Sequence, residues 1–102
     1  MALAIAERFR LLSEPTRLRL LDLMADGERS VGSLAGELGC TQANVSKHLA
    51  LLADAGLVHR RRDGLHTYYG VADPAVFALC GQVCETLRRH ADARAAALRE
   101  PA

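Results

Sequence analysis

A change of hydrophobic period near residue 57 constrains the fold more than any other feature of the sequence. Before it, apolar residues recur at helical spacing in four segments, at 2–12, 16–25, 31–38 and 42–55. After it, residues 57–60 and 65–71 carry a strand pattern, and the turn at 61–64 ends in Asp-Gly, a strong hairpin signal. Helical spacing returns over 75–98. The chain is therefore predicted to be mainly α-helical with one small β-hairpin, in the order α-α-α-α-β-β-α.

Residues that begin and end helices support these boundaries. Ser30 and Thr41 can each cap a following helix, and Gly39 suits the residue just after a helix. Two short helices joined by a tight glycine-containing turn, followed by a charged hairpin, are the parts of a winged helix-turn-helix. We expect a single dimeric domain over 1–102, with a C-terminal dimerisation helix at about 75–98.

Composition narrows the class of protein. The chain has 102 residues, of which 50% are hydrophobic and 25% charged, and its formal net charge is +1. This charge argues against a generally basic coat, but a local basic patch can still bind DNA. The sequence carries no nucleophile–base pairing signature, Gly-rich phosphate loop or paired acids suited to catalysis, so we do not expect an enzyme.

The sequence also bears on location. No apolar run approaches the roughly 20 residues of a membrane-spanning helix, and charges interrupt the apolar N-terminus. We expect a cytoplasmic protein with no membrane partner, where thiols stay reduced. The cysteines number three, and an odd count does not suggest a disulfide framework.

Polar side chains gather at the start of the segment 42–55. The second helix of a helix-turn-helix lies in the major groove of duplex DNA, with its N-terminal residues facing base edges. Amides can pair bidentately with adenine, and hydroxyls can serve bases or phosphates. We expect His48 to contact DNA or to pack, and the candidate DNA-binding residues of this helix are Thr41, Gln42, Asn44, Ser46, Lys47 and His48.

The predicted hairpin carries the densest basic cluster in the chain. Arg60, Arg61 and Arg62 lie there, with His66 on the returning strand. Alternate residues of a strand face opposite sides, so Arg60 and Arg62 are expected to share one face. Arginines at a hairpin can reach phosphates or a narrow minor groove. The alternative is a turn that only solubilises the protein, or a winged helix that binds another protein.

Four segments resemble the ArsR/SmtB family of winged helix-turn-helix, metal- or metalloid-responsive transcriptional repressors. They are Leu-Ser-Glu-Pro-Thr-Arg-Leu at 12–18, Thr-Gln-Ala-Asn-Val-Ser-Lys-His-Leu at 41–49, Leu-Ala-Asp-Ala-Gly-Leu-Val at 52–58, and the Arg-Asp-Gly hairpin. The resemblance covers nearly the whole chain. It implies a homodimer on a roughly palindromic double-stranded operator, with no cofactor required for DNA binding. It also implies that an inducer, often a metal ion or arsenite, releases the protein.

The resemblance places inducer ligands at positions that this chain does not fill. One family site has two cysteines in the helix before the recognition helix, but the matching segment here, 30–34, has none. The cadmium and lead sensors have two cysteines late in the recognition helix, and the matching stretch here has Leu51 and Ala55. The zinc, cobalt and nickel sensors of the family have Asp and His ligands along the last helix, but here Asp73 is followed by Pro74 and Ala75, and His90 is the only histidine further on. The usual arsenite, cadmium and zinc sites of the family are therefore not expected here.

Two cysteines remain as candidate ligands. Cys80 and Cys84 are four residues apart on a predicted helix and so lie on one face. Soft thiolates at that spacing could share As(III), Hg²⁺, Cd²⁺ or Pb²⁺. Simple interface packing and a redox or persulfide response are the alternatives. Cys40 is expected to pack before the cap of the next helix, with a third-ligand role as its alternative.

Overall fold

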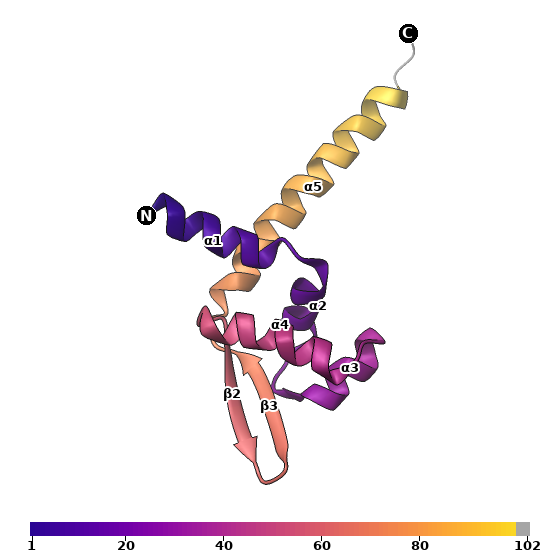
Figure 1. Cartoon of the computed structure of the whole chain (residues 1–102). Helices are drawn as coiled ribbons and strands as arrows, with labels where there is room; N and C mark the ends of the chain where they lie inside the picture. Colours follow the sequence, from indigo (N-terminus) through magenta and orange to yellow (C-terminus); the bar gives the residue numbers. More distant parts are fainter. Residues whose placement is uncertain (100–102) are drawn as a thin grey trace.

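The computed structural model describes residues 1–99. Over this range the chain forms five α-helices and three short strands, and the long α5 extends away from the body of the molecule (Figure 1). Their bounds are α1 Ala2–Leu12, α2 Pro15–Leu23, β1 Arg29–Ser30, α3 Val31–Leu38, α4 Gln42–Asp54, β2 Val58–Asp63, β3 His66–Val71 and α5 Ala75–Arg99. The predicted winged helix-turn-helix is confirmed for the described residues. The expected domain also included residues 100–102, which lie outside the described range.

The sheet differs from the prediction in two ways. It has a third strand, because β1 pairs antiparallel with β3 through Arg29 and Tyr69, giving the strand order β1-β3-β2. The hairpin is also longer than expected. Arg61 and Arg62 were placed in the turn, but β2 continues to Asp63, which pairs with His66 and leaves only two residues between the strands. Gly64 accommodates this tight turn at φ +61°.

Side-chain caps set the helix starts as predicted. The hydroxyl of Ser30 accepts a hydrogen bond from the backbone N–H of Ser33 at 3.1 Å, and that of Thr41 accepts one from Asn44 at 3.1 Å. Gly39 ends α3 in the left-handed conformation, with φ +64°. These local signals place α3 and α4 in the helix-turn-helix arrangement and fix where α4 begins.

The hydrophobic core lies under α4. Leu20 from α2, Leu34 from α3, and Val45, Leu49 and Leu52 from α4 are fully buried. The sheet closes this core with Val58 and Tyr69. By contrast, α1 and α5 each contribute one buried residue, Leu12 and Val76. The core therefore fixes α4 and the sheet, while α1 and α5 keep apolar side chains at the surface.

No helix among residues 1–99 is both long enough and apolar enough to cross a membrane.

Replacing Leu49 with Ala should lower the free energy of unfolding by about 2–5 kcal/mol, because it removes buried methyl groups and leaves a cavity. Urea denaturation measures this. The matched control is Leu51→Ala on the same helix, where the side chain is 46% exposed. That change should cost less than about 1 kcal/mol. Equal losses in the two variants would contradict the position of the core.

Candidate DNA-binding surface and thiol groove

The first two turns of α4 present a polar surface. Gln42, Asn44 and Lys47 are exposed, and Ser46 is half-buried. Thr41 stands just before them and is engaged as the cap of the helix. The buried residues of α4 are Val45, Leu49 and Leu52, so the polar side chains occupy the remaining faces. The candidate DNA-binding residues Gln42, Asn44, Ser46 and Lys47 therefore lie together at the start of α4, a helix whose position is fixed by the core.

His48 is placed differently from those side chains. Its side chain is only 17% exposed, and its Nδ1 lies 3.3 Å from a terminal nitrogen of Arg17. The carboxylate of Glu14 is 3.9 Å from the same nitrogen. Of the two roles expected for His48, the structure therefore shows a packing environment between α4 and the α1–α2 corner.

The three arginines of β2 divide between the two faces of the hairpin. Arg60 stands opposite Tyr69, whose ring is buried, and it shares its face with the buried Val58. Arg62 follows on that face toward the turn, and both arginines are exposed. They therefore continue the core-facing side of the sheet beyond the core, as their alternation predicted.

Arg61 lies on the opposite face, and its guanidinium already contacts other side chains of the protein. Its Nε donates to Glu28 at 3.0 Å, and a terminal nitrogen is 3.8 Å from Asp63. Its guanidinium also stacks over the Tyr68 ring, 4.8 Å from the centroid. The exposed His66 lies near the same ring, with centroids 6.3 Å apart. Arg61 is thus the member of the cluster with its charge already offset.

Sequence reasoning missed Glu28. It contacts Arg61 and lies 3.7 Å from the Nδ1 of His59, although the two hairpin residues are more than thirty positions away. Gly70 makes room for this arrangement, because a Cβ there would approach Nε2 of His59 to 2.6 Å. No local pattern signals such a contact, which depends on β1 pairing beside β3.

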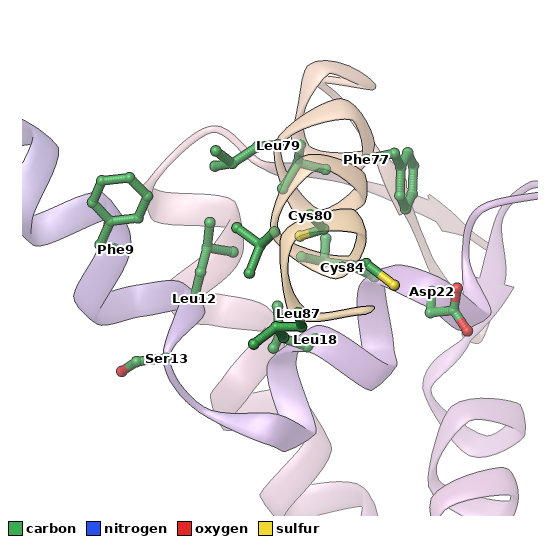
Figure 2. Close-up of a pocket in the computed structure, with 13 residues that line it drawn as sticks. Phe9, Leu12, Ser13, Leu18, Asp22, Phe77, Leu79, Cys80, Cys84 and Leu87 are labelled. Carbon is green, nitrogen blue, oxygen red and sulfur yellow. The ribbon is translucent and has the colours of Figure 1, made fainter. Parts of the chain in front are cut away.

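An apolar groove runs between α1, α2 and α5. It encloses about 500 Å³ and is lined by Phe9, Leu12, Ser13, Leu18, Leu21, Asp22, Val76, Phe77, Leu79, Cys80, Val83, Cys84 and Leu87. Figure 2 shows both predicted cysteines in this lining, with the Cys84 sulfur turned toward Asp22. Cys80 is half-buried and Cys84 is exposed, and both are free thiols. Because they stand on adjacent turns, a change of side-chain rotamer can direct both sulfurs to one ligand.

Cys40 lies elsewhere, in the turn between α3 and α4. It is half-buried against the core, and its Sγ donates to the carbonyl of Leu38 at 3.6 Å. Within residues 1–99, no three His, Cys, Asp or Glu side chains gather as a metal-binding group. The structure therefore brings Cys80 and Cys84 to one groove and does not bring Cys40 to them.

A helix-turn-helix followed by a basic hairpin wing defines a winged helix-turn-helix DNA-binding protein. The model of bacterial regulatory proteins of the arsR family matches residues 14–60. The chain belongs to this family of transcriptional regulators, as the resemblance predicted, and it is a DNA-binding regulator, not an enzyme.

Individual relatives agree with this assignment. The chain is 36% identical to the HTH-type transcriptional regulator Rv0081 of Mycobacterium tuberculosis over 93% of its own length and 84% of the relative. It is 45% identical to a probable mercury resistance operon repressor of Streptomyces lividans, over 70% of this chain and 57% of that protein. The chain thus spans little more than half of the mercury repressor.

Solved structures show the same fold. The crystal structure of Rv0081 gives a TM-score of 0.79 at 36% identity, covering 88% of this chain and 91% of that one. The homodimeric winged helix-turn-helix domain of Mb0332 from Mycobacterium bovis gives 0.75 at 34% identity, covering 85% of this chain and 83% of that one.

The division of the hairpin arginines leads to a prediction about DNA affinity. Arg60→Ala and Arg62→Ala should each reduce the salt dependence of DNA binding by about one unit of slope, because each would remove the phosphate contact that we expect of that arginine. Arg61→Ala is the matched control and should change the slope less, since Glu28 already offsets its charge. Fluorescence anisotropy over a salt series measures the slope. Identical slopes for all three variants and wild type would show that the wing does not touch the backbone.

Proposed function

We propose that this chain is a cytoplasmic, homodimeric repressor whose affinity for operator DNA falls when Cys80 and Cys84 bind a soft, thiol-binding effector. The observation that carries the proposal is the position of the two thiols on adjacent turns of α5, in a groove shared with α1 and α2. In this proposal the start of α4 contacts base edges, and Arg60 and Arg62 contact the DNA backbone.

Surface apolar residues support dimerisation. Leu3 and Phe9 on α1, and Val83 and Leu87 on α5, are all more than half exposed. Phe9, Val83 and Leu87 also line the groove, so α1 and α5 expose apolar side chains there, as at a protein–protein interface. The homodimeric Mb0332 domain has the same fold. A second copy of this chain is the partner we assign to this surface, and it would present two copies of α4 to the two halves of a palindromic operator.

Thiol chemistry sets the class of effector. Thiolates are soft ligands, so the pair suits As(III) or a soft divalent ion such as Hg²⁺, Cd²⁺ or Pb²⁺. One protomer supplies two thiols, and a third ligand could come from the second protomer across the two-fold axis. The name of the Streptomyces lividans relative, a mercury resistance operon repressor, supports Hg²⁺ as a first candidate.

The residues that line the groove connect the effector site to the DNA-binding helix α4. Leu18 and Leu21 of α2 line the groove beside the cysteines, and α2 packs against α4 in the core. An effector that draws the thiols together would favour a different packing of α5 on α1 and α2. The two copies of α4 would then no longer match successive major grooves, which lowers DNA affinity by population shift.

The dimer has a direct test. Wild-type protein should sediment as a dimer at micromolar concentration without DNA or effector. Leu87→Glu should yield monomers, because it places a charge in the apolar surface, and should weaken DNA binding. Gln82→Glu adds the same charge on α5 outside the groove and should remain dimeric. A wild-type monomer would contradict the assembly.

The effector site is tested by substitution of the thiols. Cys80→Ser and Cys84→Ser should leave DNA affinity near normal but abolish release by HgCl₂, arsenite or CdCl₂, in fluorescence anisotropy on a duplex selected from random sequences. Cys40→Ser is the matched control and should be released like wild type. The expected coupling in wild type is on the order of 1–3 kcal/mol, a usual range for allosteric pairs.

Two results would redirect this proposal. Release of the Cys80→Ser/Cys84→Ser double variant by every soft ion would place the site elsewhere and leave the two cysteines as interface packing. Release of wild type by a persulfide donor alone would make the pair a redox site instead of an ion site.

A further inference from the structure

We propose that His48 is a positioning residue, which fixes the orientation of α4 through Arg17 and does not itself contact bases. The inference rests on base contacts by α4, which are part of the proposed function, and adds the device that holds this helix in place. It assigns to His48 the second of the two roles that its place in the sequence allowed.

Arg17 connects three helices at the α1–α2 corner. Its Nε donates to the carbonyl of Leu11, in the last turn of α1, at 2.6 Å. Its backbone N–H donates at 3.1 Å to the carboxylate of Glu14, which caps α2. A terminal nitrogen lies 3.3 Å from Nδ1 of His48 on α4. One half-buried side chain thus joins the end of α1 and the start of α2 to the middle of α4.

The chemistry of the pair defines what His48 must supply. A guanidinium has only donors, so a hydrogen bond from Arg17 requires Nδ1 of His48 to be an unprotonated acceptor. The imidazole proton of the neutral ring is then on Nε2. An Asn side chain carries its oxygen at nearly the position of Nδ1, whereas a Gln oxygen reaches nearer to Nε2. His48→Asn should therefore keep the contact, and His48→Gln should lose it.

A second contact holds α4 from the same side. Arg8 of α1 donates to the carbonyl of Ala55 at 2.9 Å, and Ala55 is the C-cap residue that directly follows α4. Helix α4 is therefore attached to the α1 side at its middle and at its C-terminus. Its N-terminal turns, which carry Gln42 and Asn44, extend beyond these attachments.

A positioning role and a base-contacting role make different predictions for specificity. If His48 contacted a base, its removal would abolish discrimination at one base pair and leave the others unchanged. If it orients α4, its removal loosens the helix and weakens discrimination at all base pairs that α4 contacts. Measuring the affinity for duplexes with each base pair substituted in turn distinguishes the two roles. The affinity for a single duplex does not.

The experiment uses the full-length protein and a duplex selected from random sequences, with each base pair substituted in turn. His48→Ala should weaken binding to the selected duplex about tenfold, and Arg17→Lys at least as much, because it also loses the hydrogen bond to the Leu11 carbonyl. The double variant should bind no more weakly than Arg17→Lys alone, because that change already breaks the contact with His48. Binding to random duplex should fall less than about threefold, since phosphate contacts remain. Discrimination should decline at every base pair that α4 contacts.

Conservative variants guard against a merely structural effect. His48→Asn should bind within about twofold of wild type, and His48→Gln should behave like His48→Ala. The control is Arg19→Lys, the same change on an exposed position of α2, which should bind like wild type. Urea denaturation verifies that each variant folds, and the Asn–Gln comparison stands if the Ala variant does not.

Three outcomes would overturn the inference. The first is a loss confined to one base pair, which would make His48 a base contact. The second is equal affinity of the Asn and Gln variants, which would remove the role of Nδ1. The third is an additive loss in the double variant, which would show that His48 and Arg17 act separately.

Discussion

The burial of one stripe of α4 is the interaction on which the rest of the structure depends. Val45, Leu49 and Leu52 are fully buried and meet α2, α3 and the sheet. A helix fixed along this stripe can expose the polar side chains of its first turns at a constant angle. The same core fixes the root of the hairpin through Val58 and Tyr69. The two surfaces that we assign to DNA therefore share one rigid support.

The geometry of strand β2 determines where the positive charge of the hairpin lies. With a net charge of only +1, the protein concentrates three arginines on β2 and then separates them by the alternation of the strand. Glu28 takes up the charge of Arg61 on one face, while Arg60 and Arg62 stay exposed on the other. Such an arrangement keeps attraction to the phosphate backbone local, which limits non-specific binding to other polyanions.

The parts that could be predicted from the sequence are those with local causes. Ser30, Gly39 and Thr41 act through neighbours three or four residues away, so the helix-turn-helix was predictable from their order. The position of Cys80 and Cys84 on adjacent turns of one helix likewise follows from the helical repeat. The two-residue strand β1 is too short to produce a periodic signal, and it was missed. The contacts of Arg17 with His48 and of Glu28 with Arg61 span more than thirty residues, and only the fold brings them together.

The two cysteines lie inside the apolar surface that we assign to dimerisation, and not beside it. Assembly and sensing would then share one surface, and the two equilibria are linked by mass action. The amount of effector needed for a half-maximal response would depend on how many copies of the repressor a cell contains. A change in the expression of such a repressor would then by itself change the effector concentration at which the genes it controls are released.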